Sequence, residues 1–361
     1  MHYLIIFIFI VILCEIAFSL IYKKIYGTKY KFIKKIPIKK FVIETHPYLP
    51  FVLKKNFKLS KSEKIEYPFH KDFYTSELKT NNLGFLNGIN GSRNIKIPKP
   101  KNLFRINCFG ASTTGNYITY KKKNYSYPLE LEKILKKNSK KKIEVNNLGQ
   151  GGYNSADLLI RLSLQIIDTK PDIMIIYHAF NDIRSYFTKD FHSDFSHSRK
   201  NFGEIFWRFW LGSKIPNIPL NFVNYLTNKI LPSNHRHSLL DVVSKGEFNL
   251  KNDYRKGLKT FERNMQSIID ISVSNNIKLV MCTFCFYLHD KIKNNSIHKI
   301  FKKIVIEENK IIKKLAVKNN LKLIDCYNLI PKNNKYFVDS MHFSPYGMKK
   351  IAEIVSKSIK I

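Results

Sequence analysis

The sequence predicts an α/β fold, a three-layer α/β/α sandwich with a central parallel sheet, preceded by a transmembrane helix at the N-terminus. Three observations lead to this prediction. From residue 103 onward, short apolar segments alternate with longer segments whose apolar residues recur at helical spacing. The short segments are apolar almost throughout, which is typical of parallel strands covered by helices on both faces. Residues 3–22 form a nearly uncharged run that is long enough to cross a bilayer as a helix.

The N-terminal run contains one charged residue, Glu15, between Tyr3 and Tyr22. No Lys or Arg precedes it and no A-x-A-type cleavage site follows, so an anchor over residues 1–25 is favoured over a cleaved signal peptide. A buried helix of a soluble protein is the remaining alternative. The lysine-rich segment that follows would hold that flank in the cytoplasm by the positive-inside rule, but lysine is abundant everywhere and large domains can cross regardless of charge. We therefore expect a single-pass membrane protein of undecided orientation.

The rest of the chain divides into two parts. Residues 26–100 contain scattered Pro, Gly and Tyr, which predicts an extended, β-rich segment that ends in a linker. The main domain is predicted over residues 101–361, with amphipathic helices between its strands. Its strands are expected at 103–109, 143–147, 172–177, 278–284 and 321–325.

The charge balance is strongly basic, with 62 Lys and Arg against 27 Asp and Glu and a formal net charge of +35. Such an excess can indicate binding to nucleic acid or to an anionic membrane surface. However, the lysines are spread along the whole chain, and no zinc-knuckle, RNA-binding or helix-turn-helix signature accompanies them. Nucleic-acid binding is therefore not expected.

The five cysteines, an odd number, do not form a disulfide framework. Cys282 and Cys285 have the spacing of a redox or zinc motif, but they follow an apolar strand and no second pair lies near them in the sequence. We interpret them as buried cysteines of the core.

Four segments carry residues with catalytic potential, and each follows a predicted strand or precedes the last helix. They contribute Ser112 in GASTTG, Gly152 in NNLGQGGYNS, Asn181 in YHAFND, and Asp339 with His342 in DSMHFSPYG. In a parallel sheet the carboxyl ends of the strands meet at one edge, where the functional sites of such folds lie. Taken singly, each segment could be a tight turn, a helix cap or a polar loop. Together they supply a nucleophile, two oxyanion donors, a base and an acid that orients the base.

These motifs resemble the four blocks of the SGNH hydrolases, also called GDSL-type esterases, and the resemblance covers about residues 80 to 361. It implies the flavodoxin-like SGNH hydrolase fold, with residues 184–250 as an insertion that the family pattern does not explain. It also implies Ser112 as nucleophile, Asp339 and His342 as acid and base, and Ser112, Gly152 and Asn181 as the oxyanion hole. Two positions depart from the family pattern: Ala111 replaces the Asp of the GDS motif, and Ala179 replaces a glycine common in the third block.

The resemblance implies a membrane-anchored serine esterase that hydrolyses O-acyl esters, O-acetyl esters among them, of a glycan or a lipid through an acyl-serine. It implies no metal ion and no organic cofactor, and it favours the periplasmic or extracytoplasmic side of the membrane. Two alternatives remain open. One is an O-acyltransferase that uses the same Ser-His-Asp site to modify a glycan. The other is a catalytically inactive membrane-bound binding module, which the Ala111 and Ala179 departures would favour.

Overall fold

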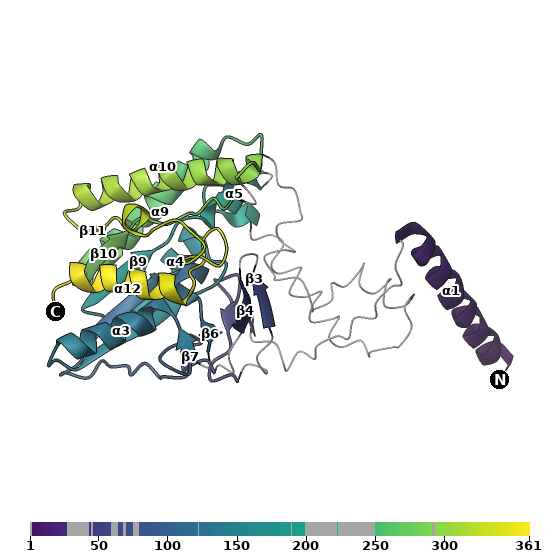
Figure 1. Ribbon diagram of the computed structural model, residues 1–361, viewed down its shortest axis with the longest axis horizontal. Helices are drawn as coiled ribbons and strands as arrows, with labels where there is room; N and C mark the ends of the chain where they lie inside the picture. Colours follow the sequence, from purple (N-terminus) through teal and green to yellow (C-terminus); the bar gives the residue numbers. More distant parts are fainter. Residues whose placement is uncertain are drawn as a thin grey trace. The chain divides into compact units, whose positions relative to one another are not determined.

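The computed structural model describes most of the chain in two units (Figure 1). One unit holds the N-terminal helix α1 (His2–Tyr26) with residue 222, and the other holds the central sheet and its helices. Most of the predicted insertion at 184–250 lies outside the described residues. The described ranges are 2–26, 43–44, 46–58, 64–67, 70–74, 79–121, 123–188, 190–198, 222, 250–290 and 293–361.

The centre of the second unit is a sheet of five parallel strands, β5 (Phe104–Gly110), β8 (Ile143–Gly149), β9 (Ile173–Tyr177), β10 (Lys278–Cys282) and β11 (Lys322–Ile324). Their order across the sheet is β11-β10-β9-β5-β8, which is the flavodoxin-like order 2-1-3-4-5 when the strands are counted along the chain. The register pairs Gly110 with both Gly149 and Tyr177, so the carboxyl ends of β5, β8 and β9 lie at one edge.

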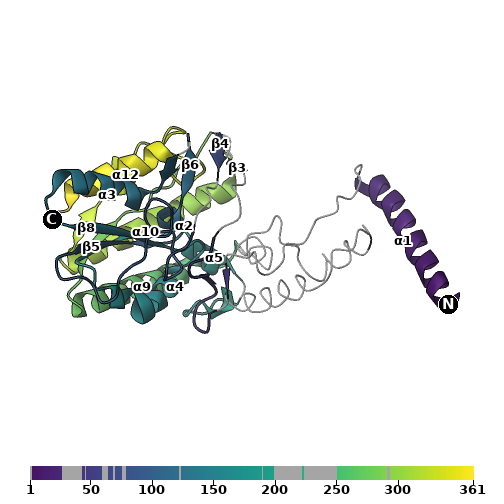
Figure 2. The ribbon, with the colours of Figure 1, turned by 90° about the horizontal axis from the view of Figure 1, so that it is seen from below.

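Helices cover both faces of this sheet and make the three layers. Helix α3 contacts β8 and packs against α12, and α9 contacts α4, α5 and α10. Figures 1 and 2 show α9 on the opposite face from α3 and α12. The helices are α2 (Ser112–Gly115), α3 (Tyr127–Asn138), α4 (Ser155–Arg161), α5 (Asp182–Phe187), α9 (Tyr254–Ser274), α10 (Ser296–Lys318), α11 (Cys326–Leu329) and α12 (Pro345–Ser358).

The predicted fold class is confirmed. Each of the five strands lies at its predicted place in the sequence, although β10 ends two residues earlier than the range expected for it. All five residues of β9 are buried, as expected for a strand covered on both faces. The layered architecture therefore follows from the alternation of apolar and amphipathic segments.

Short polar side chains fix where the main helices begin. The Ser126 hydroxyl accepts the backbone N–H of Leu129 at the start of α3, and Ser344 accepts that of Gly347 at the start of α12. Asn154 caps α4 in a reciprocal pair with Asp157. Such caps satisfy backbone donors that have no partner inside the helix.

Two small antiparallel sheets accompany the central one. Strand β1 (Ile43–Glu44) pairs with β2 (Val52–Leu53). The other sheet has four strands in the order β3 (Lys64–Tyr67), β4 (His70–Tyr74), β6 (Ile118–Tyr120) and β7 (Lys123–Tyr125). Its last two strands follow α2, so this sheet joins the N-terminal region to a segment near the carboxyl edge of the central sheet.

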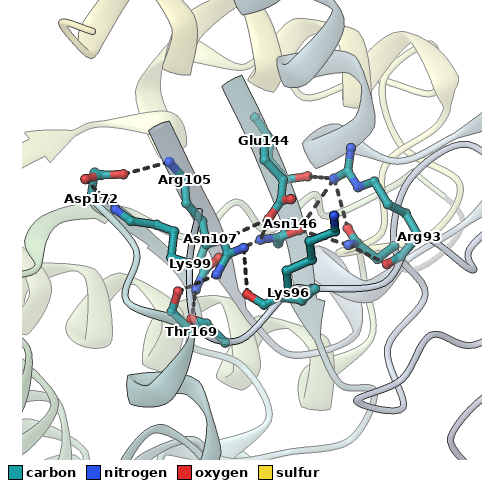
Figure 3. Close-up of polar contacts among 12 residues, drawn as sticks. Arg93, Lys96, Lys99, Arg105, Asn107, Glu144, Asn146, Thr169 and Asp172 are labelled. Atoms are coloured by element: carbon teal, nitrogen blue, oxygen red, sulfur yellow. Dashed lines mark hydrogen bonds and ion pairs between the residues drawn. The ribbon is translucent and has the colours of Figure 1, made fainter. Parts of the chain in front are cut away.

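A buried polar network joins the central sheet to the strap, which we define as residues 79–100 (Figure 3). Arg105 on β5 is fully buried and donates Nε to Glu144 at 2.8 Å. The same guanidinium donates to the carbonyl of Thr169 at 2.6 Å and to the carbonyl of Lys96 in the strap at 3.0 Å. Since a buried charge is tolerated only when it is paired and hydrogen-bonded, these contacts hold the strap against the sheet.

The strap also contacts β8 through two of its side chains. The Asn87 amide donates to Asn146 Oδ1 at 2.9 Å, and its oxygen accepts the backbone N–H of Asn147 at 3.1 Å. Arg93 donates Nη2 to the carbonyl of Val145. Side chains of the strap therefore bond backbone groups of β8 that point away from β5.

Helix α1 forms the described part of the first unit, together with residue 222. It is the one described helix that is long and apolar enough to cross a membrane, with a mean hydropathy of 3.1 in its most apolar window. A signal sequence near the N-terminus would meet the same criterion. The helix covers the part of the chain where the sequence predicts an anchor over residues 1–25.

The cysteines of the second unit, Cys108, Cys282, Cys285 and Cys326, are all buried and free. The interpretation of Cys282 and Cys285 as core residues is confirmed by this burial. Burial raises the pKa of the Cys108 thiol to about 12, so that thiol stays protonated and packs as a small apolar group.

Candidate active site

Ser112 and His342 meet at the carboxyl edge of the sheet although 230 positions separate them in the chain. Ser112 is the first residue of α2, directly after β5, and His342 lies just before α12. The distance from Ser112 Oγ to His342 Nε2 is 2.9 Å, and both side chains are half-buried. The predicted contact between these two residues is confirmed.

Asp339 binds the other side of the His342 ring. Its Oδ2 lies 2.7 Å from His342 Nδ1, and its Oδ1 accepts the backbone N–H groups of Met341 at 2.8 Å and His342 at 2.7 Å. Burial disfavours the charge on Asp339, but the His342 ring and these hydrogen bonds outweigh it and hold the pKa of Asp339 below its ordinary value. An ionised carboxylate only accepts, so Nδ1 carries the proton and Nε2 is the acceptor that faces Ser112.

The turn that presents Ser112 depends on a close approach of backbones. A Cβ atom at Gly110 would lie 2.4 Å from the Tyr177 carbonyl oxygen, and one at Gly149 would lie 2.0 Å from the Gly115 nitrogen. Both distances are impossible for a side chain, so glycine is required where β5 and β8 end. This packing sets α2 directly on the end of β8 and brings its first residue to the edge of the sheet.

Ala111, one of the two departures from the family pattern, stands at the cap of α2. Its side chain is buried and makes no capping hydrogen bond, while its carbonyl accepts the N–H groups of Thr114 and Gly115. Ala179, the other departure, is also buried. Neither methyl group lies in the line of hydrogen bonds that joins Ser112, His342 and Asp339.

The loop after β8 lies beside Ser112. Gln150 donates its N–H to the Gly110 carbonyl at 3.0 Å, and a Cβ atom at Gly151 would lie 3.8 Å from Ser112 Cβ. Gly152 has a φ of +84°, a conformation that favours glycine. Gly152 therefore lies in the loop that passes beside Ser112.

Asn181 reaches the same loop from the end of β9. It donates Nδ2 to the Tyr153 carbonyl at 2.9 Å, and its side chain is half-buried. An amide nitrogen carries two N–H bonds, and the contact with Tyr153 uses one of them. An arrangement with such donors beside an activated hydroxyl is suited to acyl transfer, because the donors can receive the charge of a tetrahedral intermediate.

Arg161 is not among the residues predicted from the sequence, and it contacts the loop after β8. Arg161 is buried, donates Nη1 to Gln150 Oε1 at 3.0 Å, and stacks its guanidinium over the Phe85 ring at 4.0 Å. Burial lowers the pKa of Arg161. Arg161 is the last residue of α4, and its neighbours on the same face, such as Leu158 and Leu162, are apolar. A charged residue on an apolar helix face is the feature of the sequence that could have identified it.

The polar stretch 190–197 does not assemble a metal site among the residues that the structure describes. His197 bonds the Ser185 carbonyl through Nε2 at 2.7 Å and accepts the His192 N–H through Nδ1 at 3.0 Å. Asp194 accepts the Ser196 N–H at 2.9 Å. These local bonds are typical of a polar loop.

No family model matches the sequence, and no curated protein matches it. Several solved structures are similar. The acetylxylan esterase Axe2 from Geobacillus stearothermophilus has 14% identity and a TM-score of 0.43, over 71% of this chain and 94% of that one. A lipase/acylhydrolase from Enterococcus faecalis has 17% identity and a TM-score of 0.42, over 70% and 93%. A GDSL-like lipase from Bacteroides thetaiotaomicron has 13% identity and a TM-score of 0.40, over 70% and 86%. At such low identities and TM-scores, these similarities do not assign an activity to the chain.

Proposed function

We propose that this protein is a membrane-anchored serine esterase of the SGNH type, which hydrolyses O-acyl esters, O-acetyl esters among them, of a glycan or a lipid. The observation that carries the proposal is the continuous line of hydrogen bonds from Ser112 through His342 to Asp339. A lone serine hydroxyl is a weak nucleophile, and this arrangement supplies the base and the orienting anion that activate it.

In the acylation step, Ser112 Oγ attacks the ester carbonyl while His342 Nε2 takes the hydroxyl proton. Asp339 holds the ring in the required tautomer and stabilises the imidazolium that forms. The bond to the alcohol then breaks, and His342 returns its proton to the leaving oxygen. An acyl-serine remains, and no metal ion or organic cofactor takes part.

In the second step, His342 takes a proton from water, whose oxygen attacks the carbonyl of the acyl-serine. The bond between this carbonyl and Ser112 Oγ then breaks, the acid leaves, and His342 returns the proton to Ser112 Oγ. The charge on the carbonyl oxygen in both steps is received by the N–H groups of Ser112 and Gly152 and by the Asn181 amide. If a sugar hydroxyl takes the place of water, the same residues carry out O-acyl transfer.

Labelling with a fluorophosphonate probe tests the proposal without knowledge of the substrate. We expect the full chain, purified in detergent, to be labelled at Ser112 and to hydrolyse p-nitrophenyl acetate. Release of acetate without a sugar acceptor supports an esterase, and turnover only with an added glycan acceptor supports a transferase. Protein that is neither labelled nor active between pH 6 and 9 would instead favour the inactive binding module.

Substitution of Asn181 with alanine tests the oxyanion donors. Loss of one such donor typically slows kcat by about 100-fold or more, and we expect a loss of this size with little change in KM. Labelling of Ser112 should persist at a lower rate, because the nucleophile and its base are intact. A variant that hydrolyses p-nitrophenyl acetate at the wild-type rate would remove Asn181 from the oxyanion hole.

The anchor is proposed from α1, whose apolar window is long enough to span a bilayer. We expect the intact chain, with residues 1–25 present in its measured mass, to remain in the membrane pellet after a carbonate wash and to dissolve in detergent. Deletion of residues 1–25 should move the protein to the soluble fraction. Recovery of the intact chain in a high-speed supernatant without detergent would contradict the anchor.

The family resemblance favours the extracytoplasmic side of the membrane for the domain. Whether the domain is protected from added protease in intact cells would test this orientation.

A further inference from the structure

Asp182 lies next to Asn181 in the chain, and its carboxylate is fully buried. Three donors surround it. Ser155 donates its backbone N–H to Oδ2 at 2.9 Å and its hydroxyl to Oδ1, and His178 Nε2 lies 2.7 Å from Oδ2. Asn264 on α9 donates its amide to Ser155 Oγ at 2.9 Å and so orients that hydroxyl toward Asp182.

These bonds join the two loops that bear the proposed oxyanion donors. Ser155 is the first residue of α4 and comes three positions after Gly152, while Asp182 is the first residue of α5 and directly follows Asn181. The bond from Asn181 to the Tyr153 carbonyl is a second tie between the same two loops. Two adjacent bridges, Asp182–Ser155 and Asn181–Tyr153, therefore fix the separation between the Gly152 N–H and the Asn181 amide. The Asp182–Ser155 bridge is the stronger, because its acceptor is a buried carboxylate.

His178 serves Asp182 and takes no part in the line that contains Ser112. Its ring is buried, and Nδ1 has no hydrogen-bond partner among the residues that the structure describes. Because Nε2 faces a carboxylate, the proton lies on Nε2, and a second proton on Nδ1 would be buried without an acceptor. His178 thus donates through Nε2 to Asp182.

The neighbouring acid, Glu308 on α10, does not compete for these donors. Burial raises its pKa well above the ordinary value, and the negative charge of Asp182 raises it further. Glu308 Oε1 accepts the Tyr186 hydroxyl at 2.8 Å, so this acid binds a donor that Asp182 does not use.

We infer that Asp182 is a positioning residue, which holds the Gly152 and Asn181 donors at the spacing needed by the transition state. The inference rests on the proposed function, since it concerns the same site. Donors of an oxyanion hole act only when they are held within a fraction of an ångström of the developing charge, so a looser bridge costs rate more than affinity for the substrate. The buried Asp182–Ser155 bridge is the device that maintains this spacing.

The test compares Asp182→Asn with Glu144→Gln in the detergent-purified full chain. Glu144 is a matched control, because it also accepts hydrogen bonds from buried donors, Arg105 and Asn146 at 2.8 Å each. It lies near the amino end of β8, whereas the active site lies at the carboxyl ends of the strands. We expect Asp182→Asn to lower kcat for p-nitrophenyl acetate by about 10- to 100-fold with KM changed by less than about 3-fold, which is the size of a lost hydrogen bond to a charged group. Glu144→Gln should lower Tm and leave kcat within about 2-fold of wild type.

A double-mutant cycle with Asn181→Ala separates positioning from a general loss of stability. If Asp182 acts through the oxyanion donors, its substitution should matter less once the Asn181 donor is removed. We expect the logarithm of the fold loss in kcat caused by Asp182→Asn to be at most half as large in the Asn181→Ala background as in the wild-type background. Equal fold losses in kcat in both backgrounds, or a kcat loss no larger than that of Glu144→Gln, would overturn the inference.

If Asp182→Asn does not fold, Ser155→Ala in the same cycle removes only the hydroxyl bond and should lower kcat by about 3- to 10-fold. Inactive wild-type protein would refute the proposed function, whereas active wild type with an unaffected variant refutes only the role of Asp182.

Discussion

Replacing Ser112 with alanine should remove probe labelling altogether and lower kcat for ester hydrolysis by about 10⁶-fold, as expected when a serine nucleophile is lost. The variant has no atom that can form the acyl-enzyme, and the remaining rate would come only from the oxyanion donors and from binding. Tm should change by little, because Ser112 is half-buried and its hydroxyl makes one hydrogen bond within the described part of the chain, to His342. Active-site titration and thermal unfolding in detergent would measure both effects.

Thr113→Val is the matched control for this substitution. Thr113 is the next residue of α2, and its buried hydroxyl has no hydrogen-bond partner among the described residues. Removing that hydroxyl should leave labelling and kcat within about 2-fold of wild type, since nothing is left unpaired. Ester hydrolysis by Ser112→Ala at more than a hundredth of the wild-type rate would show that another group is the nucleophile.

Asp339→Asn should lower kcat by about 10⁴-fold, the usual cost of losing the orienting anion of a triad. The amide would present an N–H to His342 Nδ1 in place of an acceptor, so the ring would adopt the tautomer whose Nε2 carries the proton and cannot take one from Ser112. Labelling should become very slow for the same reason. A loss of less than about 10-fold would contradict this role for Asp339.

The same variant has a pH signature in stability. The pKa of Asp339 is lowered in the folded protein, so its charge stabilises the fold above the pKa of an unfolded Asp, about 3.9, and this contribution is lost as the pH falls through the folded-state value. The difference in unfolding free energy between wild type and Asp339→Asn should therefore be present at pH 7 and shrink below about pH 4. A difference that does not change down to pH 2 would show that Asp339 does not bear this charge.

Much of the sheet could be predicted because its strands are specified locally. A run such as IMIIY in β9 is apolar at every position, and Gly or polar residues mark its end. Strands β6 and β7 were not predicted, because ITY and KNY are short and polar in part, and their pairing, β6 with β4 and β7 with β6, fixes them. The strap was seen only as a linker, since its bonds go to residues such as Asn146 that are distant in the sequence.

The site was predictable to the extent that its residues form motifs. Ser112, Asp339 and His342 could be named because each stands in a short segment of recognisable composition, and the structure brings the three together. The Asp182–Ser155 bridge could not be found in that way. A Ser that begins a helix and an Asp that follows an Asn are both ordinary caps in a sequence, and only their meeting across two loops gives them a further role.

The position of the strap along β8 also bears on how copies of this protein behave beside one another. Strand β8 lies at an edge of the central sheet, and an open edge offers backbone groups with which a strand of another molecule can pair. Asn87 and Arg93 already bond the N–H of Asn147 and the carbonyl of Val145, the groups that an incoming strand would need. The membrane anchor proposed from α1 would confine copies of the chain to a plane. Because side chains of the strap occupy the β8 edge, copies of the protein can lie close together without their central sheets pairing into one continuous sheet.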